Sequence, residues 1–395
     1  MSPDHHTHKK SCPHCGNNPV NHTASYMLEF VQILTNPFYR VMTVIPAHTA
    51  RKIVSVMYWP FIYITGVFGV WKYHYDKRKA LSDRTRVIWD EAEKRGIEME
   101  GIMIMGKPIE QYRAKINGSW HYFESLPIPP HLHHEKCAWI DDKNKLKKLM
   151  HDSGIPTAYG GLVTTYDQAL HIFRSGKAPY IIKPRSGSRG RHTTTHIYSE
   201  SDLRRAYDIG KQLSHFLMME EHLIGSVYRG TYIAGEVVGI LRGDPPRITG
   251  DSTSTIPELI DHKNRTKHPK VSSFVLTDHA RNFLSRQGLS ETTVLKKGHT
   301  IDLSEKIGLS YGGYAADVTE QTHPDIIKIL KVAGDSTQSP VVGFDFIIPD
   351  VTTDPKDQRW GIIEANTLPF IDLHHFPLEG TPLNVAAKIW DLWNR

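Results

Sequence analysis

The amino-acid sequence predicts a soluble protein of mixed helix and strand content, and three observations support this fold class. The 395 residues are enough for two or three domains with cores of their own. Hydrophobic residues make up 39% and charged residues 23%, which is typical of globular proteins and not of disordered polyelectrolytes. From Ser82 onward, amphipathic helix patterns alternate with short apolar strands.

Charge and cysteine content narrow the ligand class and the compartment. The net charge of +6 suits an anionic ligand, a nucleic acid or an anionic lipid surface. Basic residues are interleaved with acidic ones, so we expect no nucleic-acid partner. The three cysteines, Cys12, Cys15 and Cys137, do not support a disulfide framework, and residues 1–22 lack the apolar core of a secretory signal. We therefore expect a cytoplasmic protein, with peripheral membrane contact as the alternative.

The first 80 residues contain two segments whose roles stay open. Residues 1–25 form a polar, histidine-containing tail in which Cys12 and Cys15 belong to a CPHC motif. This motif predicts either a zinc site, completed by one or two nearby histidines, or a disordered tail. Residues 26–80 are apolar and rich in aromatics, and Ile53–Trp71 carries no charge. That stretch allows three predictions: a buried pair of elements, a helix on a membrane surface, or a membrane span.

A small α/β domain is predicted over residues 81–136. Ser82 is suited to cap a helix that ends near Gly96, and an apolar strand follows it. Asn117-Gly118 then separates two alternating runs, which is a strong signal for a hairpin.

Lysines and glycines in the next segment favour an anion site. A basic helix begins at Asp142, and a later apolar strand, Tyr180–Ile182, ends at Lys183. Gly187 and Gly190 follow in a turn between two strands. Backbone N–H groups and an ammonium in such a turn suit polyphosphate oxygens, although any other anion would also fit.

Acidic residues end two further predicted strands. The apolar strand Phe216–Met219 leads through Glu220 and Glu221 into a connector, where it would either hold a base or simply end in solvent. In GIIEAN, Glu364 and Asn366 are two residues apart and therefore share one face of their strand. A carboxylate and a carboxamide at the end of an apolar strand are costly unless something binds them.

Taken in order, these motifs resemble the ATP-grasp superfamily of carboxylate–amine ligases, most of all the ATP-grasp region of cyanophycin synthetases and bifunctional glutathione synthetases. The stretches GDSTSTIPELIDHKNR and SYGGYAADVTEQTHPD are similar to motifs of that region. The resemblance covers residues 137–395 and implies an α+β ATP-grasp fold, in which two α+β lobes hold ATP between antiparallel sheets.

The resemblance also implies a role for each motif. Asp345, Glu364 and Asn366 would bind Mg²⁺, or Mn²⁺ as an alternative. Lys143 and Lys183 would hold phosphates of ATP, and Lys183 and Arg229 would act in catalysis, Arg229 beside an acylphosphate. The remaining expected contacts are a phosphate lid at Gly187, Ser188 and Gly190, an adenine site at Glu220, Glu221 and Leu223, and a substrate contact at Ser310, Gly312 and Gly313.

The implied function is an ATP- and Mg²⁺-dependent ligase that forms an amide through an acylphosphate. Its partners would be small-molecule or peptide carboxylates and amines, and the protein would form a homo-oligomer or remain a monomer. Six positions depart from the pattern. Val227 stands where an acidic residue would hold the ribose, and His192 where a loop glycine is expected. Ser304 and Gly308 stand where cyanophycin synthetases have an arginine and an asparagine, and Phe370 and Asp372 where they have a glycine and then an arginine. The alternative is a non-catalytic ATP-binding or scaffold protein with the same fold.

Overall fold

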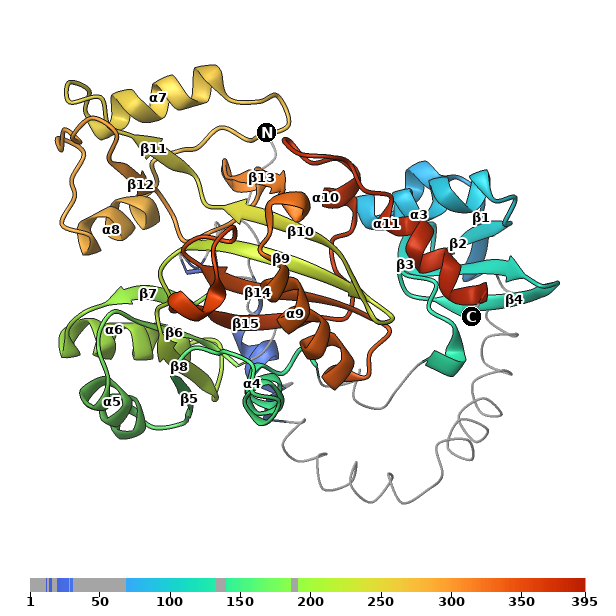
Figure 1. Ribbon diagram of the computed structural model, residues 1–395, viewed down its shortest axis with the longest axis horizontal. Coiled ribbons are helices and arrows are strands. Elements are labelled where there is room, and N and C mark those ends of the chain that lie inside the picture. Colours follow the sequence, from blue (N-terminus) through green and yellow to red (C-terminus); the bar gives the residue numbers. More distant parts are fainter. Residues whose placement is uncertain are drawn as a thin grey trace, which may run out of the picture.

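Two antiparallel sheets, of four and five strands, form the main body of the computed structural model (Figure 1). The structure describes residues 12, 14–15, 20–27, 29–30, 69–132, 140–185 and 191–394. Every pair of neighbouring strands in its named sheets runs antiparallel. The predicted mixture of helices and strands is confirmed.

The four-stranded sheet carries two helices and forms the smaller lobe. Its strands are arranged in the order β5-β8-β6-β7. The elements are β5 (Gly160–Val163), α5 (Tyr166–Ser175), β6 (Tyr180–Pro184), β7 (Thr194–Ile197), α6 (Glu200–Lys211) and β8 (Leu217–Glu221). Ser199 caps α6, because its side chain accepts a hydrogen bond from the Asp202 N–H. Apolar residues of the helices and strands, such as Ile182 and Leu203, form one buried cluster.

The five-stranded sheet has the order β13-β10-β9-β14-β15 and presents two different faces. Its strands are β9 (Ser226–Ile233), β10 (Glu236–Asp244), β13 (Tyr314–Asp317), β14 (Val341–Ile348) and β15 (Gly361–Asn366). Along β9, Tyr228 and Tyr232 belong to the core on one side, where α9 (Pro324–Thr337) packs. Arg229 and Thr231, which alternate with them, lie on the opposite face. This opposite face is the polar face referred to below.

Helix α4 (Lys143–Asp152) lies beside the β15 edge of this sheet and close to α9. Its apolar residues Leu146 and Met150 join the core under the five-stranded sheet. Asp142 is its N-cap, as predicted, and accepts hydrogen bonds from the backbone N–H groups of Asn144 and Lys145. In Figure 1, α4 lies below β15 and to the right of β5 and β8.

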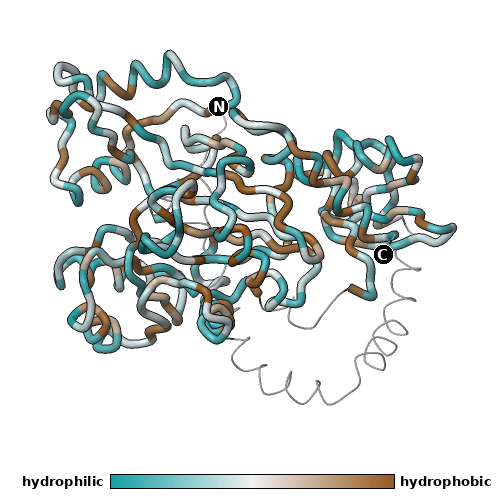
Figure 2. Tube along the Cα trace, in the orientation of Figure 1, coloured by the Kyte–Doolittle hydropathy of each residue, from teal (hydrophilic) through white to brown (hydrophobic). Residues whose placement is uncertain are grey.

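Residues 245–303 add a unit with its own small core. It contains β11 (Arg247–Thr249), α7 (Ile256–Thr266), α8 (Asp278–Arg286) and β12 (Thr300–Asp302). Along this unit and along the sheets, the chain alternates between hydrophobic and hydrophilic residues (Figure 2), as expected for elements with one face on a core. The short helices η4 (Leu309–Tyr311) and η5 (Thr319–Gln321) flank β13.

The leading unit is a four-stranded antiparallel sheet, in the order β1-β2-β3-β4, packed on one helix. It contains β1 (Trp71–His74), η1 (Lys77–Lys79), α3 (Asp83–Lys94), β2 (Met99–Ile104), β3 (Lys107–Ile116), β4 (Ser119–Phe123) and, after them, η2 (Pro130–Leu132). Ser82 caps α3, and Asn117-Gly118 joins β3 to β4 with positive φ angles of 50° and 78°, so both predictions are confirmed.

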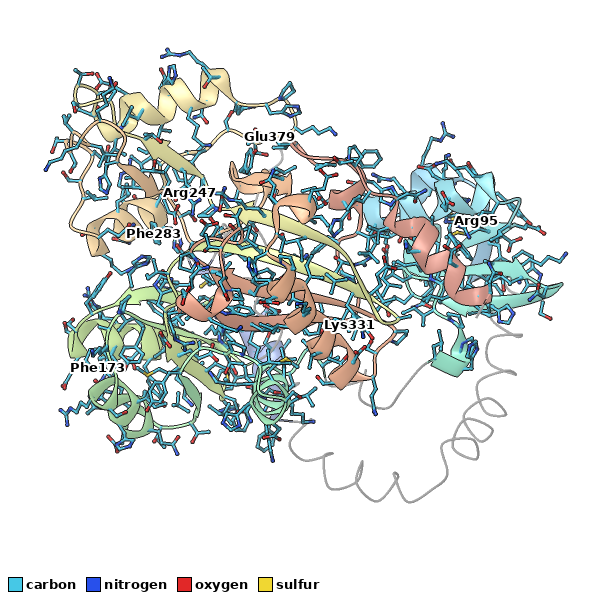
Figure 3. All side chains as sticks on the ribbon, viewed as in Figure 1. Arg95, Phe173, Arg247, Phe283, Lys331 and Glu379 are labelled. Atoms are coloured by element: carbon cyan, nitrogen blue, oxygen red, sulfur yellow. The ribbon has the colours of Figure 1, made fainter. Side chains whose placement is uncertain are left out.

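The C-terminal residues pack against this leading unit. Helix α11 (Val385–Trp390) lies on α3, followed by η7 (Asp391–Asn394). The buried indole of Trp390 donates a hydrogen bond to the Ile88 carbonyl oxygen over 3.0 Å. Arg95, labelled in Figure 3, donates to Asp391 over 2.8 Å. The first and last parts of this region therefore share one core.

Most of the apolar stretch Ile53–Trp71 lies outside the described residues, so its three interpretations stay predictions. Only its last residues, 69–71, are described, and Trp71 opens β1. Among the described residues, none of the helices combines the length and the hydropathy that crossing a membrane requires.

Candidate functional site

One face of α4 links the two sheets through a pair of lysines. Lys143 and Lys147 are four residues apart and therefore project from the same side of the helix. Lys143 Nζ lies 3.4 Å from Glu364 Oε1 on β15, whereas Lys147 Nζ donates to Glu220 Oε1 on β8 over 2.6 Å. Helix α4 thus places one ammonium against each sheet.

Glu220 is the centre of a buried charge cluster in the smaller lobe. Its second oxygen, Oε2, lies 2.8 Å from Lys183 Nζ on β6. Burial alone would raise the pKa of the Glu220 carboxyl, but Lys183 and Lys147 lower it to about 2. The carboxylate therefore stays charged and holds both lysines in place. Lys147 was not among the residues predicted from the sequence, since a lysine within a basic helix gives no signal of its own.

Three charged residues form a row across the five-stranded sheet. The β-sheet register pairs Asp345 on β14 with Arg229 on β9 on one side and with Glu364 on β15 on the other. Arg229 donates to both oxygens of Asp345, over 2.6 and 2.8 Å. Burial acts to lower the pKa of Arg229, but the charge of Asp345 outweighs it and raises that pKa.

A β-bulge directs Glu364 to the polar face. The pairing of β14 with β15 shifts between Asp345 and Phe346, so that Phe346 faces Ile362 while Asp345 faces Glu364. Ile362 belongs to the core, and without the extra residue Glu364 would point the same way. Asn366 pairs with Gly343 beyond the bulge and shares the face of Glu364, as predicted.

Asp345, Glu364 and Asn366 fit the requirements of a magnesium site. They supply carboxylate and carboxamide oxygens from neighbouring positions on two paired strands. Mg²⁺ prefers such hard oxygen donors, together with water and phosphate oxygens. Both carboxylates also have cationic partners, Arg229 for Asp345 and Lys143 for Glu364. A bound Mg²⁺ would therefore share these carboxylates with the two cations.

The chain segment after β15 crosses the polar face of the sheet. A Cβ atom on Gly343 would lie 2.8 Å from Pro369 Cβ, so glycine permits this close approach. The ring of Phe370 lies 5.4 Å from the Arg229 guanidinium carbon and 5.7 Å from that of Arg84 on α3. Arg84 also donates to the Leu368 carbonyl oxygen over 2.5 Å. The leading unit therefore contributes a cation to this region, which the sequence did not indicate.

Asp372 begins the short helix α10 (Asp372–His375) beside these cations. Burial raises the pKa of its carboxyl, whereas Arg84 and Arg229 oppose that shift. Its Oδ1 is buried and has no hydrogen-bond partner among the described residues. In the sequence, Asp372 is one of the departures from the family pattern.

A second buried network, also missed from the sequence, fixes α10 against the sheet. His374 Nδ1 donates to Asp317 Oδ2 over 3.1 Å, and its Nε2 lies 2.8 Å from the Thr231 hydroxyl. Burial lowers the pKa of His374, although Asp317 opposes the shift. The three residues come from distant parts of the sequence, so no local pattern could have revealed them.

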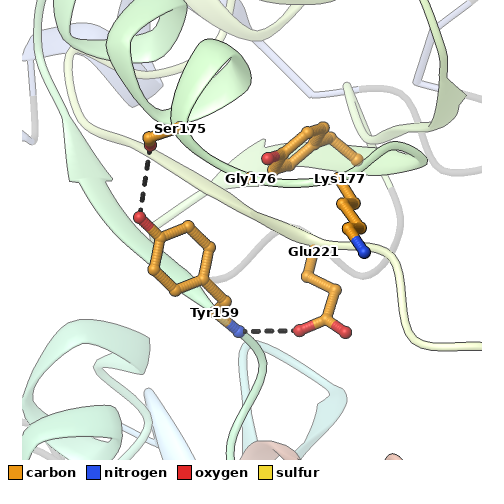
Figure 4. A pocket seen from close by; sticks show the side chains of 6 residues that line it. Tyr159, Ser175, Gly176, Lys177 and Glu221 are labelled. Atoms are coloured by element: carbon orange, nitrogen blue, oxygen red, sulfur yellow. Dashed lines mark hydrogen bonds between the residues drawn. The ribbon is translucent and has the colours of Figure 1, made fainter.

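The connector after β8 is held by Glu221. Its carboxylate accepts hydrogen bonds from the Tyr159 N–H over 3.1 Å and from Arg359, which precedes β15, over 2.5 Å. Figure 4 shows Glu221 and Tyr159 at a cavity of about 310 Å³ that is also lined by Ser175, Gly176, Lys177 and Tyr180. Leu223 is buried nearby in sequence. Of the expected adenine residues, Glu220 and Glu221 therefore lie where the two lobes meet.

The expected substrate contact lies at the far edge of the five-stranded sheet. Ser310 is within η4, and Gly312 adopts a φ of +83°, which favours glycine. The Gly313 N–H donates to the Gly308 carbonyl oxygen, which closes the turn ahead of β13.

Three arginines that could hold an acidic substrate have carboxylate partners within the chain. Arg242 and Arg247 each pair with Asp244, and Arg247, labelled in Figure 3, also pairs with Asp302. Arg265 pairs with Asp261 on the surface of α7.

The three residues of the expected phosphate lid, Gly187, Ser188 and Gly190, lie outside the described residues. Val227 is half-buried on β9, between Gly243 and Ile347.

The two lobes and the charged residues between them define the class of fold. No family model matches the chain. The crystal structure of a bifunctional glutathione synthetase from Pasteurella multocida has a similar fold, with a TM-score of 0.55 and 22% sequence identity, over 80% of this chain and 44% of that one. The chain has the ATP-grasp fold predicted from the sequence.

Sequence comparisons identify related proteins. Cyanophycin synthetase from Synechocystis is 30% identical over 260 residues, which are 64% of this chain and 30% of that protein. The glutathione biosynthesis bifunctional protein GshAB from Clostridium perfringens is 31% identical over 263 residues, which are 64% of this chain and 34% of that protein. The chain is thus related to both groups, as predicted, and spans about a third of the length of these relatives.

Proposed function

We propose that the protein is an ATP- and Mg²⁺-dependent carboxylate–amine ligase. The observation that carries this proposal is the alignment of Arg229, Asp345 and Glu364 in one row across three strands, with Lys143 beside it. A row of two carboxylates flanked by two cations suits metal-bound phosphates. Relatedness to cyanophycin synthetase and to a bifunctional protein of glutathione biosynthesis supports the same reaction class.

In this proposal, the two lysine sites hold the phosphates of ATP. Lys143 and Lys183 would bind phosphate oxygens from opposite lobes, and Glu220 would keep Lys183 and Lys147 in position. Glu221 and Leu223 would border the adenine, and Gly187, Ser188 and Gly190 would cover the phosphates. Asp345, Glu364 and Asn366 would hold Mg²⁺, which neutralises charge on the phosphates when bound.

The chemistry needs two displacements. An oxygen of the substrate carboxylate attacks the γ-phosphorus, the bond to the β-phosphate bridging oxygen breaks, and ADP leaves. The amine nitrogen of the second substrate then attacks the acyl carbon, inorganic phosphate leaves, and the nitrogen loses a proton. Arg229 would stabilise the phosphoryl charge in both steps, so the protein would act through positioning and charge stabilisation.

The substrates are proposed by class. The turn at Ser310, Gly312 and Gly313 would contact a small-molecule or peptide substrate through backbone groups. Arg242 and Arg247 already have carboxylate partners in the chain, so they do not by themselves indicate an acidic substrate.

A second candidate is a protein that binds ATP without ligating anything. One observation favours it: Asp345, a proposed metal ligand, is engaged through both oxygens by Arg229. The two hydrogen bonds from Arg229 occupy lone pairs on both Asp345 oxygens, which makes Asp345 a weaker ligand for Mg²⁺.

The test is ADP and phosphate release from Mg²⁺–ATP across a panel of amino acids and peptides. Wild type is compared with Glu364→Gln, and Glu236→Gln serves as the control because Glu236 makes an exposed ion pair with Lys388. We expect release that depends on both an acid and an amine, that is lost in Glu364→Gln and that persists in the control. ATP binding without stimulated release would favour the second candidate, and equal release by Glu364→Gln would contradict the assigned metal site.

A further inference from the structure

Four side-chain atoms that could bind a metal ion lie close together between the N-terminal tail and the smaller lobe. They belong to Cys12, Cys15, His22 and His192, and all lie within 4.8 Å of one another. Cys15 Sγ lies 3.1 Å from His22 Nε2 and 3.5 Å from His192 Nε2, and Cys12 Sγ lies 3.6 Å from His192 Nε2. Three of the residues are close in sequence, whereas the fourth is 170 positions after His22.

Two of these three distances, 3.5 and 3.6 Å, fall in the range of a tetrahedral zinc site, and the third, 3.1 Å, is slightly shorter. Zinc–sulfur bonds of about 2.3 Å and zinc–nitrogen bonds of about 2.0–2.1 Å place neighbouring ligand atoms roughly 3.3–3.8 Å apart. Two sulfur and two nitrogen donors are a usual set for structural zinc and not for Mg²⁺. Cys15 and His192 are almost completely buried, with exposed fractions of 2% and 1%. Such burial is typical of a closed structural site.

The second ring nitrogen of His192, Nδ1, has a hydrogen-bond partner that leaves Nε2 available for a metal ion. Nδ1 lies 2.7 Å from the Ile209 carbonyl oxygen. A carbonyl oxygen only accepts, so Nδ1 carries the proton and the neutral ring presents the Nε2 lone pair to the cysteines. Histidines that bind metals usually donate their other N–H in this way, which fixes the ring orientation.

His192 also adopts a backbone conformation that favours glycine. Its φ is +50°, a region in which a side chain is uncommon. Its N–H donates to the His14 carbonyl oxygen over 3.0 Å, so the backbone of this turn and that of the tail are joined beside the sulfur atoms. A buried histidine in this conformation indicates that its imidazole has a local role.

The tail makes further contacts with the same lobe. Residues 22–27 are helical, and the Tyr26 ring packs 4.0 Å, centroid to centroid, from His215. Glu29 accepts hydrogen bonds from the Ser214 hydroxyl over 2.8 Å and from the His215 N–H over 2.6 Å. These polar contacts are partly exposed, so they are worth only about 1 kcal/mol each. A metal bond at the other end of the segment would hold it far more strongly.

We propose that Cys12, Cys15, His22 and His192 bind a structural zinc ion that fastens the N-terminal segment to the smaller lobe. The proposal does not depend on the ligase activity, because none of the four residues belongs to the proposed ATP site. It assigns the CPHC motif to metal binding and supplies the two histidines that the motif alone did not identify.

The test measures metal in the full-length protein, purified without a polyhistidine tag. Zinc per chain is determined by mass spectrometry for wild type, Cys15→Ser and His192→Gly. Glycine at 192 removes the ligand but suits the positive φ, so loss of metal would not reflect backbone strain. His14→Gln is the matched control, because His14 lies beside the cluster without belonging to it. A variant with His5, His6 and His8 all changed to Gln controls for chelation by the tail.

We expect about one zinc per chain in wild type and in both controls, and a loss of about tenfold or more in Cys15→Ser and His192→Gly. Replacement by Co²⁺ should give thiolate-to-metal absorption in wild type and not in Cys15→Ser. Chelation should increase hydrogen exchange in residues 12–30, and added zinc should reverse it, which keeps the test valid if a variant folds poorly. Metal-free wild type that cannot be loaded, zinc retained in His192→Gly, or a Cys12–Cys15 disulfide in protein purified without reductant would overturn the proposal.

Discussion

At the scale of single residues, the charge of Glu220 matters for the stability of the fold, because this carboxylate is buried between two lysines. We expect Glu220→Gln to lower the free energy of unfolding by about 3–5 kcal/mol, because it leaves Lys183 buried without a counter-charge. Urea unfolding at pH 7 measures this. The double variant Glu220→Gln with Lys183→Met should recover part of the loss, and the exposed Glu236→Gln should change stability by less than about 0.5 kcal/mol.

The same residue predicts a pH dependence. The pKa of Glu220 is lowered from 4.5 to about 2 in the folded protein, so the folded state binds fewer protons than the unfolded state in this range. Its stabilising contribution should be complete above about pH 4.5 and should be lost as the pH falls toward about 2. Wild type should therefore lose stability more steeply than Glu220→Gln in urea titrations across this window. Parallel curves for the two proteins would contradict the assignment.

Arg229 is predicted to act through the shape of its guanidinium as well as its charge. Arg229→Lys keeps one positive charge but cannot donate to both Asp345 oxygens at once. Once a substrate pair is known, we expect kcat to fall by about 10²–10³ with little change in the Kd for ATP. Arg242→Lys, at an arginine that pairs with Asp244 away from the charged row, is the control. An unchanged kcat would remove Arg229 from the catalytic residues.

At the scale of elements, α4 makes an ion pair with each of the two sheets. Asp142→Ala removes its N-cap and should cost about 1 kcal/mol of stability. Because Lys143 and Lys147 are in the first two turns of α4, we also expect weaker ATP binding, measured by calorimetry. Ser199→Ala removes the equivalent cap from α6, which carries none of the proposed ATP contacts. It should cause a similar loss of stability with no loss of ATP affinity, and an equal effect of both variants on ATP binding would contradict the role of α4.

At the scale of the whole molecule, the C-terminal helix α11 packs against the leading unit. Trp390 is buried in the core of the leading unit although it lies near the end of the sequence. Trp390→Ala should cost about 3–5 kcal/mol and should make the leading sheet more sensitive to limited proteolysis. Tyr75→Ala, on the exposed surface of the same unit, is the control. Unchanged proteolysis in Trp390→Ala would show that α11 does not support this core.

Local sequence patterns predicted the elements that depend on short-range chemistry. Ser82 and Asp142 cap their helices because a Ser or Asp side chain reaches N–H groups only two or three residues away. The Asn117-Gly118 turn was predictable because few residues tolerate two successive positive φ angles. The order of the motifs, compared with a known superfamily, then predicted the fold.

The sequence by itself also determined that Glu364 and Asn366 share a strand face, through the period of two. Its resemblance to a known superfamily then indicated which residues are candidates for metal and phosphate binding. Only the tertiary structure decided what these residues contact. The bulge beside Asp345, the reach of Lys147 to Glu220, the approach of Arg84 and the meeting of His192 with Cys12 and Cys15 all join residues far apart in the chain. Such contacts are set by how sheets and helices pack, and no periodicity within one element encodes the position of another.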